Sequence, residues 1–260
     1  MHQVKPKKSL GQHFLTDMNI AKKITSSLSG TGYVALIEIG PGTGVLTQYL
    51  LNSSCPFYAY EIDKESIAFL KKNFQSDDFI IEGNFLKQDL TSLPQPFAII
   101  GNFPYNISSQ IFFKILENRN SISEVVCMVQ KEVAERIASP HGNKTYGILS
   151  VFLQTFFDIS YMFTVHEHCF RPSPKVKSAV IRLKRNERKS IDCDPKLFFR
   201  IVKQSFNQRR KTLRNSLKNI CLNLRENDKF GNKRPEQLNV EEFIELTRVI
   251  ESCLSNKNKE

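Results

Sequence analysis

Short apolar runs alternate with longer amphipathic segments through the first half of the chain, and this alternation restricts the fold more than any other feature. Five runs have the length and composition of buried strands: residues 34–39, 57–62, 79–81, 97–101 and 125–129. Between them, segments such as 63–74 and 107–116 have the apolar spacing of helices. Strands and helices that alternate in this way predict a parallel sheet with helices on both faces. Two later runs, 159–165 and 177–183, are expected at the edge of that sheet.

A glycine-rich turn follows the first run, between a predicted strand and a predicted helix. Gly40 and Gly42 allow the backbone to turn tightly and to approach a ligand closely. The spacing differs from the Gly-x-Gly-x-x-Gly of dinucleotide sites, and no P-loop lysine is present. Glu61 ends the second strand, where a carboxylate can accept both hydroxyls of a ribose. These features favour a nucleoside cofactor without a pyrophosphate, S-adenosylmethionine above all, over a purely structural turn.

A second polar group stands at the end of the fourth run, in the segment Asn102-Phe103-Pro104-Tyr105. Ligands of open α/β sheets bind at the carboxyl ends of the strands. Asn102 and the carbonyl of Phe103 offer two hydrogen-bond acceptors, and Pro104 restricts the backbone there. Tyr105 adds a flat face. Two acceptors beside an aromatic ring suit a planar group that carries an NH2, such as adenine; an Asn-Pro turn with a packed tyrosine is the alternative.

The charge of the chain is concentrated in its last third. The formal net charge is +11, but residues 1–170 have a net charge of −1 and residues 171–260 a net charge of +12. Such asymmetry indicates a polyanionic partner, and nucleic acid in particular, over a basic surface kept for solubility.

The C-terminal part changes to a helical period after a polar segment. We expect a first domain at 1–185, a linker at 186–195 and a basic helical domain at 196–260, with a helix break near Asn207. One face of this domain is apolar: Phe198, Val202, Phe206, Leu213, Leu217 and Ile220. A last helix at about 240–254 is expected to bury Phe243, Leu246, Val249 and Ile250.

Other features exclude several protein classes. No run of about 18 apolar residues is present, and the basic N-terminus lacks the apolar core of a secretory signal. The six cysteines form no Cys-x-x-Cys pair, which argues against a zinc site and against a disulfide framework. We therefore expect a cytoplasmic protein with reduced thiols, no metal and no membrane contact.

Beyond these features, the sequence resembles the small-subunit ribosomal RNA adenine dimethyltransferases, the KsgA/RsmA family, over nearly its whole length. The resemblance rests on a series of motifs in a fixed order: Leu10-Gly-Gln-His-Phe-Leu15, Glu38 to Gly44, Glu61, Gly101 to Ser108, Gln130-Lys-Glu-Val133, Phe170-x-Pro-x-Pro-x-Val-x-Ser178 and Phe206 to Leu217. It implies a Rossmann-like class I S-adenosylmethionine-dependent methyltransferase fold, with a mostly parallel seven-stranded sheet and a small all-α C-terminal domain. It also implies a monomer that acts on small-subunit rRNA within an immature small subunit.

The resemblance also implies roles for individual residues. Asn102, the carbonyl of Phe103, which precedes Pro104, and Tyr105 would hold the target adenine, while Phe170 would close on its other face. The cofactor would be bound by Gln12, His13, Leu15, Glu38, Gly40, Gly42, Glu61, Ile62, Asn84, Phe85 and Asn102. RNA phosphates would be bound by Arg209, Arg210, Lys211 and Arg214.

One position departs from the pattern that the resemblance implies. The family usually has Gly-Asp after the third strand, with the Asp on the adenine of the cofactor, whereas this chain has Gly83-Asn84. The amide oxygen of Asn84 can still accept one hydrogen bond but carries no charge, so we expect weaker cofactor binding, by about 1 kcal/mol.

The expected product is a pair of adjacent dimethyladenosines in the loop of the helix near the 3′ end of the small-subunit RNA. Two alternatives stay open at this point. One is a large-subunit rRNA adenine methyltransferase that confers antibiotic resistance. The other is a non-catalytic factor in ribosome assembly or transcription on the same fold.

Overall fold

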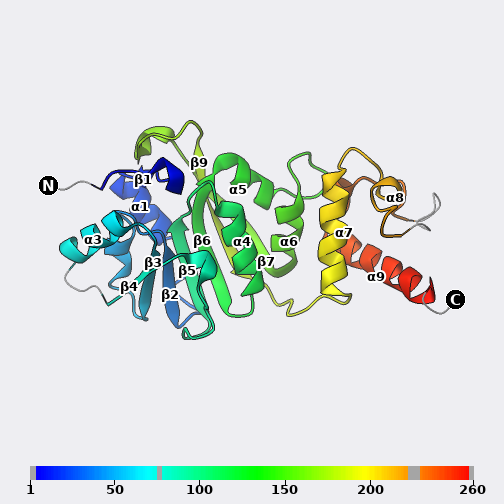
Figure 1. The fold of residues 1–260 in the computed structure, drawn as a ribbon, viewed down its shortest axis with the longest axis horizontal. Coiled ribbons are helices and arrows are strands. Elements are labelled where there is room, and N and C mark those ends of the chain that lie inside the picture. The colour runs from blue at the N-terminus through cyan, green and yellow to red at the C-terminus, as the bar shows by residue number, and fades with distance from the viewer. Residues whose placement is uncertain (1–3, 75–77, 222–228, 258–260) are drawn as a thin grey trace. The chain divides into compact units, whose positions relative to one another are not determined.

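The computed structural model describes residues 4–74, 78–221 and 229–257 (Figure 1). These residues group into two compact units. Unit 1 comprises residues 1–134 and 157–186, and unit 2 comprises residues 135–156 and 187–260. No helix in the described ranges has both the length and the apolar character needed to cross a membrane.

Unit 1 is built on a seven-stranded sheet with the strand order β4-β3-β2-β5-β6-β9-β7. The strands are β2 Ala35–Ile39, β3 Phe57–Glu61, β4 Ile80–Glu82, β5 Phe97–Asn102, β6 Ile122–Gln130, β7 Phe157–Val165 and β9 Ser178–Arg185. The first five strands of this order pair in parallel, and β9 pairs antiparallel with both β6 and β7. The expected mostly parallel α/β sheet is confirmed. Only β7 of the two late strands is at the edge, because β9 inserts between it and β6.

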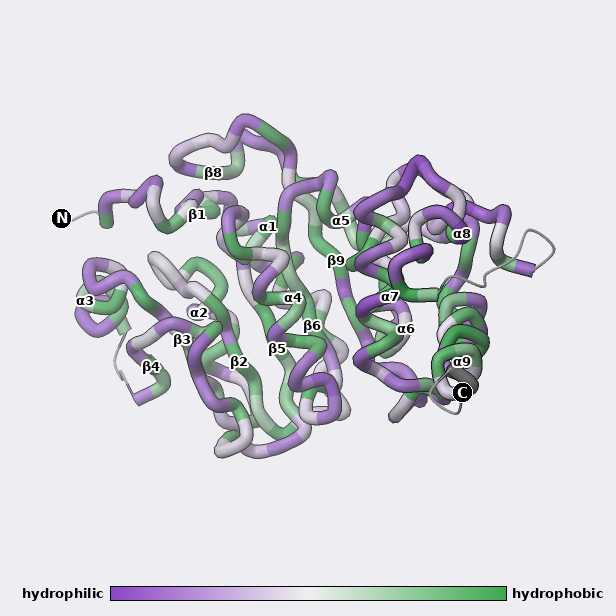
Figure 2. Tube along the Cα trace, turned by 45° about the vertical axis from the view of Figure 1, so that its right-hand side comes forward, coloured by the Kyte–Doolittle hydropathy of each residue, from purple (hydrophilic) through white to green (hydrophobic). Residues whose placement is uncertain are grey.

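Helices lie on both faces of this sheet (Figure 1). They are α1 Met18–Thr25, α2 Thr47–Leu50, α3 Lys64–Asn73 and α4 Ser108–Glu117, followed by α5 Lys131–Ala138 at the boundary of the two units. On one face, Ile24 of α1 and Leu50 of α2 pack in a core with Ile100 of β5 and Val126 of β6. The central strands are hydrophobic along most of their length (Figure 2), as expected of strands that are covered on both sides.

Polar caps fix where the helices of unit 1 begin. The side chain of Asp17 accepts hydrogen bonds from the backbone N–H of Asn19 and of Ile20, at 2.9 and 3.1 Å, so α1 starts directly after it. Asp63 caps α3 in the same way through the N–H of Glu65, at 3.3 Å. A cap immediately after β3 turns the chain out of the sheet at its carboxyl edge.

A small second sheet attaches the N-terminal segment to a distant part of unit 1. Strand β1, Phe14–Leu15, pairs antiparallel with β8, Phe170–Arg171. Short 3-10 turns precede both strands, η1 Lys8–Leu10 and η3 Glu167–Cys169. The sequence analysis did not find this sheet, because a strand of two residues is too short to show a period.

The order of the strands marks one position at the carboxyl edge. The chain runs from β2 outward to β3 and β4, and then returns to β5 on the other side of β2. Such a reversal leaves a crevice between the two adjacent strands, and ligands of open α/β sheets bind there. Gly40 directly follows β2 and Asn102 ends β5, so both lie at this switch point.

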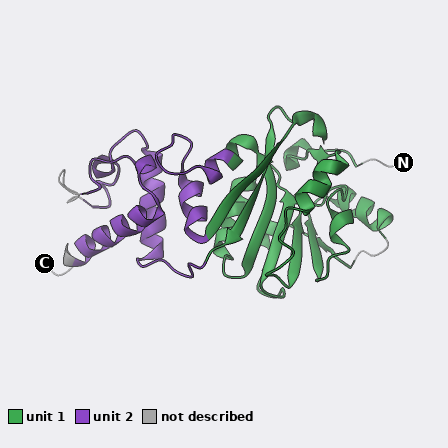
Figure 3. Cartoon of the chain, turned by 180° about the vertical axis from the view of Figure 1, so that it is seen from behind, with its two compact units in different colours: residues 1–134, 157–186 green, residues 135–156, 187–260 purple. Residues whose placement is uncertain are grey.

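Unit 2 is helical (Figure 3). Its helices are α6 Ile148–Phe156, α7 Pro195–Asn207, α8 Leu213–Ser216 and α9 Val240–Lys257, with a 3-10 turn, η4, at Pro235–Gln237. The expected break near Asn207 is present, since α7 ends at that residue.

The residues that form unit 2 differ from those of the expected C-terminal domain in one respect. Residues 135–156 group with it, whereas the sequence analysis placed them in the first domain. The reason is aromatic packing, because the ring of Phe152 lies 4.2 Å from the ring of Phe199 and 6.1 Å from that of Phe198.

One residue of α9 was assigned to the wrong face. Phe243, Leu246 and Ile250 are buried as predicted, but Val249 is 40% exposed. Val249 precedes Ile250 by one residue and so points roughly 100° away from it around the helix. Thr247, which follows Phe243 by four residues, is buried in its place.

Candidate functional site

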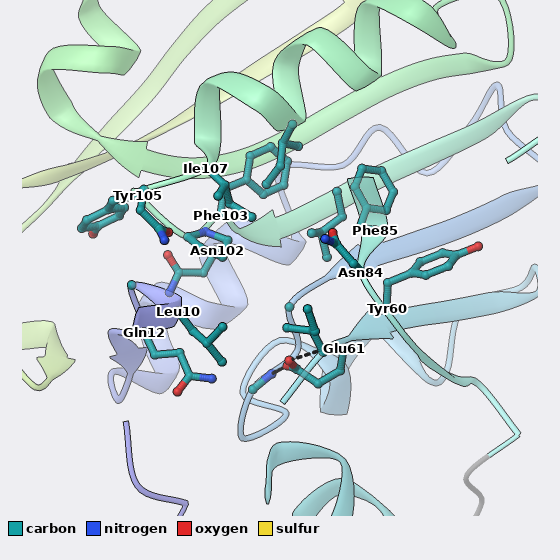
Figure 4. A pocket seen from close by; sticks show the side chains of 18 of the residues that line it. Leu10, Gln12, Tyr60, Glu61, Asn84, Phe85, Asn102, Phe103, Tyr105 and Ile107 are labelled. Atoms are coloured by element: carbon teal, nitrogen blue, oxygen red, sulfur yellow. Dashed lines mark hydrogen bonds between the residues drawn. The ribbon is translucent and has the colours of Figure 1, made fainter. Parts of the chain in front are cut away.

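A cavity of about 300 Å³ opens at the switch point of the sheet, in unit 1 (Figure 4). This volume is at the lower end of the range of small-molecule sites. Twelve of the residues that the sequence analysis proposed line it: Gln12, His13, Gly40, Gly42, Glu61, Ile62, Asn84, Phe85, Asn102, Phe103, Pro104 and Tyr105. The structure therefore brings together side chains from the N-terminal segment and from the ends of β2, β3, β4 and β5.

The glycines after β2 keep one side of the cavity open. Gly40 and Gly42 have φ angles of +67° and +57°, a conformation that favours glycine. A Cβ atom on Gly42 would lie 2.9 Å from the ring of Phe14, which is too close. A Cβ on Gly40 would meet no protein atom within 4 Å, so a side chain there would take up space that a ligand can use. This loop fits a ligand that approaches the backbone directly.

Glu61 ends β3 with a carboxylate that the backbone holds in place. One oxygen accepts hydrogen bonds from the N–H groups of Ile62 and Asp63, at 2.8 and 2.9 Å, and the other from the N–H of Gly42, at 3.0 Å. Burial raises the pKa of Glu61, and these three N–H groups oppose that effect. The oxygen that accepts only from Gly42 keeps a lone pair, so the carboxylate can still accept a ligand hydroxyl at a fixed position.

Asn102 presents an unused acceptor to the cavity. Its side-chain NH2 donates to the backbone oxygen of His13 at 2.9 Å, which sets the orientation of the amide. Its Oδ1 is buried and has no hydrogen-bond partner among the described residues. Buried polar atoms nearly always have a partner, so this oxygen indicates a ligand N–H or O–H at that point.

Phe103 and Tyr105 frame the same end of the cavity. The ring of Phe103 is fully buried and meets the ring of Phe112 of α4 at 5.9 Å, while its N–H donates to the backbone oxygen of Met128 at 3.0 Å. The hydroxyl of Tyr105 shares a short hydrogen bond with Ser178. Burial raises the pKa of Tyr105, and the bond to Ser178 opposes the rise. The tyrosine is therefore a neutral, fixed ring.

His13 stacks on Tyr105, which the sequence did not indicate. The two ring centroids are 5.4 Å apart, with 23° between the planes, and His13 Nδ1 lies 2.8 Å from the backbone oxygen of Pro172. One face of Tyr105 is therefore covered by His13.

Asn84 lies on the side of the cavity opposite Leu10 and Gln12 (Figure 4). Its Oδ1 accepts the N–H of Leu86 at 3.0 Å and so caps the 3-10 turn η2, Phe85–Lys87. The oxygen that was expected to bind a cofactor amine already has a protein partner.

Three of the residues proposed to bind the cofactor or the target adenine lie outside the cavity. Leu15 and Phe170 pair with each other in the β1–β8 sheet and are buried in the core of unit 1. The structure therefore does not bring Phe170 to the face of a base in this cavity. Glu38 is buried in the sheet, where it accepts a hydrogen bond from the Thr47 hydroxyl at 2.7 Å. Burial raises the pKa of Glu38 to about 8.

The sequence analysis missed several residues of the site. Leu10, Tyr60 and Ile107 line the cavity. The position of Leu10 beside the Gly-Gln motif was the available signal, whereas Tyr60 looked like an ordinary strand residue. Lys7 and Asp63 are not among the lining residues, but both form hydrogen bonds with Gln12, which is one of them.

The basic residues proposed to bind RNA belong to unit 2. Arg210 and Lys211 are exposed. Arg209 has partners within the unit, since its Nε lies 3.7 Å from a carboxylate oxygen of Glu236 and its Nη2 donates to the backbone oxygen of Asn143 at 3.5 Å. Two neighbouring cations therefore extend into solvent beside one that is held by a carboxylate.

The sequence profile of the ribosomal RNA adenine dimethylases matches residues 3–256. The chain belongs to this family. Its members include proteins named "Ribosomal RNA small subunit methyltransferase A". The one from Cytophaga hutchinsonii is 58% identical, with 96% of this chain and 99% of that protein covered. The one from Phocaeicola vulgatus is 53% identical, with 99% and 94% covered.

Solved structures of related proteins support the same assignment. A dimethyladenosine transferase from Plasmodium falciparum is 25% identical with a TM-score of 0.79, over 92% of this chain and 98% of that one. The 23S rRNA methyltransferase ErmE is 24% identical with a TM-score of 0.68, over 90% and 99%, and this likeness concerns the fold alone. The expected family, fold class and enzyme class, an rRNA adenine dimethyltransferase, are confirmed.

Proposed function

We propose that the chain transfers methyl groups from S-adenosylmethionine to the exocyclic amines of two adjacent adenosines in the loop of the 3′-terminal helix of small-subunit rRNA. The reaction belongs to the biogenesis of the small subunit, and the substrate is RNA within an immature subunit, on which the enzyme acts as a monomer. The single observation that carries the proposal is the buried, unpartnered Oδ1 of Asn102 at the switch point of the sheet. The names of the relatives at 53–58% identity support the small-subunit substrate.

The cavity fits the proposed cofactor. The carboxylate of Glu61, held by three N–H groups, would accept a ribose hydroxyl, and the absence of a side chain on Gly40 leaves space for the ligand next to the backbone. Ile62 and Phe85 supply apolar surface for the adenine ring. When bound, the cofactor supplies an electrophilic methyl group on a sulfonium.

The protein promotes attack by the substrate amine through its hydrogen-bond acceptors. The lone pair of an adenine amine is delocalised into the ring, which makes it a poor nucleophile. The Oδ1 of Asn102 and the carbonyl oxygen of Phe103 accept hydrogen bonds from the two N–H groups of this amine. These bonds draw the nitrogen toward tetrahedral geometry and so localise its lone pair. The methyl group supplied by the cofactor would bond to this nitrogen, which would then release its proton to water. Catalysis therefore depends on position and electrostatics, with no covalent enzyme intermediate.

The target base reaches these acceptors only after it leaves its stack in the RNA. Extrusion costs a few kcal/mol, and stacking on an aromatic side chain returns about 1–3 kcal/mol per base. Tyr105 provides such a ring, but His13 covers one of its faces. An adenine that stacks on Tyr105 must use the opposite face or displace His13. The role of Phe170 as a second stacking partner requires that residue to leave the core, so Tyr105 is the stronger assignment.

Asn102→Ala tests the central assignment. We expect kcat to fall at least about a hundredfold, since a group that acts on the reacting nitrogen is lost, while the Kd for RNA stays within about twofold. Methyl transfer to immature small subunits from cells that lack the protein, with mapping of the modified bases, measures both the rate and the substrate.

Asn73→Ala is the matched control, because Asn73 is exposed at the end of α3 and its side-chain amide donates to the backbone oxygen of Phe69 in its own helix, at 2.7 Å. A loss of RNA affinity that equals the loss of turnover in Asn102→Ala would contradict the assignment. Dimethyladenosine found in large-subunit RNA instead would favour the large-subunit alternative.

A further inference from the structure

A cluster of polar side chains joins the N-terminal segment to the start of α3, just outside the cavity. The ammonium group of Lys7 makes a short ion pair with Asp63 and lies 3.2 Å from a carboxylate oxygen of Glu65. The amide of Gln12 bridges the same groups: its Oε1 accepts the backbone N–H of Lys7 at 2.8 Å, and its Nε2 donates to Asp63 at 3.2 Å.

Asp63 is the fixed member of this cluster. Its side chain is 1% exposed, against 36% for Lys7, and it also accepts hydrogen bonds from the N–H of Glu65 and the hydroxyl of Ser66. Burial alone would raise the pKa of Asp63, but the hydrogen bonds from Lys7, Gln12 and Ser66 outweigh it and the pKa is lowered. A buried carboxylate with this set of partners is ionised at neutral pH and needs a cation beside it.

The segment that this cluster holds forms one wall of the cavity. Ser9, Leu10, Gly11, Gln12 and His13 line it, and Figure 4 shows Leu10 and Gln12 across the cavity from Asn84 and Phe85. The turn is closed by local bonds from the N–H groups of Leu10 and Gln12 to the oxygen of Lys7, at 3.1 and 3.4 Å.

The two ends of this wall are attached independently. At its far end, Phe14 and Leu15 pair with β8, and the backbone oxygen of His13 orients Asn102. At its near end, Lys7 and Gln12 contact Asp63 and Glu65 at the start of α3, and the backbone oxygen of Ser9 accepts a long hydrogen bond from the side chain of Asn106, at 3.4 Å. Loss of the contacts with Asp63 and Glu65 therefore leaves residues 7–12 with the weaker bond to Asn106, while Asn102 stays in place.

We propose that Lys7, Gln12 and Asp63 form a latch that holds the N-terminal segment closed over the cofactor cavity, with Lys7 as a positioning residue for cofactor binding that does not itself touch the cofactor. The proposal rests on the proposed function in that the ligand of the cavity is S-adenosylmethionine. The latch keeps cofactor affinity high, and its half-exposed ion pair makes that affinity sensitive to salt.

The first measurement needs no cofactor. We expect Lys7→Met to speed backbone hydrogen exchange at residues 8–12 of the free protein, with no change in α3, since Asp63 keeps its hydrogen bonds with Glu65 and Ser66. Lys7→Arg should restore the slow exchange. Lys8→Met is the matched control, because Lys8 is the next residue of the same turn and its side chain is exposed.

The second measurement is cofactor binding by calorimetry together with steady-state kinetics. Lys7→Met should raise the Kd and the KM for S-adenosylmethionine about fivefold, with kcat within about twofold, and Lys7→Arg should recover the affinity. Lys7→Met combined with Asp63→Asn should be no worse than the more harmful of the two single changes, because both remove the same contact.

The outcomes separate the latch from the proposed function. Unchanged hydrogen exchange in Lys7→Met overturns the latch. If cofactor affinity falls while hydrogen exchange is unchanged, Lys7 contacts the ligand directly. Equal effects of Lys7→Met and Lys8→Met overturn it as well. If the wild-type protein binds no S-adenosylmethionine, but Lys7→Met still exchanges faster than the wild type at residues 8–12, the latch stands and the proposed function is overturned.

Discussion

At the scale of single residues, the side chains of this site divide into those that face the cavity and those that hold them. Glu61 and Asn102 face the cavity, and each is oriented by backbone groups. The sequence predicted both, because each ends a strand and strand ends are visible in the local pattern. It could not predict the ion pair of Lys7 with Asp63, which joins residues 56 positions apart, or the stacking of His13 on Tyr105. Such contacts depend on how distant segments meet, which no local period records.

Glu38 leads to a prediction about pH. Its pKa rises from an ordinary value of 4.5 to about 8 because it is buried, so the folded state binds a proton that the unfolded state releases. The stabilisation that the proton provides is complete below pH 4.5 and is lost as the pH rises to 8. Urea unfolding at pH 5.5 and 7.5 should show the wild type losing up to about 1.4 kcal/mol per pH unit relative to Glu38→Gln. Parallel pH curves would mean that Glu38 is ionised throughout.

Asn84 leads to a prediction about cofactor affinity. Its oxygen caps η2 through the N–H of Leu86 and keeps one lone pair, whereas its NH2 group can only donate. In Asn84→Asp, one oxygen would keep the cap and the second would accept from the cofactor amine. We expect about 1 kcal/mol tighter S-adenosylmethionine binding by calorimetry. An affinity that stays the same or falls would show that the base does not reach this position.

At the scale of elements, the long periodic segments were predicted well and the short ones poorly. The helix at 107–116 and the strand at 97–101 match α4 and β5 within one residue at each end. The β1–β8 sheet was missed because two residues carry no period, and α5 was missed because its eight residues follow β6 without a break. In α9 the helical period was predicted correctly, but the predicted buried face was too wide and included Val249, which is exposed.

The corrected face of α9 can be tested with two truncations. Phe243 is fully buried, and its ring lies 6.0 Å from that of Phe206, whereas Val249 is 40% exposed. Phe243→Ala should lower the free energy of unfolding of unit 2 by about 3 kcal/mol or more, and Val249→Ala should change it by no more than about 0.5 kcal/mol. Denaturant unfolding followed by circular dichroism compares them. Similar losses of stability for both variants would support the original prediction that Val249 is buried.

At the scale of the whole molecule, the sequence predicted two parts but drew one continuous border between them. The segment 135–156 belongs to unit 2, although residues before and after it belong to unit 1. The apolar character of α6 showed that this helix is buried. It did not show which core covers it, because Phe152 needs only an apolar neighbour and either unit offers one.

The charge of the last third gives a prediction about RNA binding. If Arg210 and Lys211 contact phosphates, the logarithm of RNA affinity should fall steeply with the logarithm of salt concentration. Arg210→Ala and Lys211→Ala should each weaken binding to all sequences and reduce the slope by about 1. Asn102→Ala should lose turnover with an unchanged slope. A flat salt dependence of the wild type would contradict the assignment.

The pairing of Phe14 with Arg171 and of Leu15 with Phe170 also has a consequence for synthesis. Residues 14 and 15 are translated about 155 residues before their partner strand. On the nascent chain, Phe14, which lines the cavity, therefore has no partner strand until residue 171 has been made. This wall of the cavity thus takes its final place only after most of unit 1 has been synthesised.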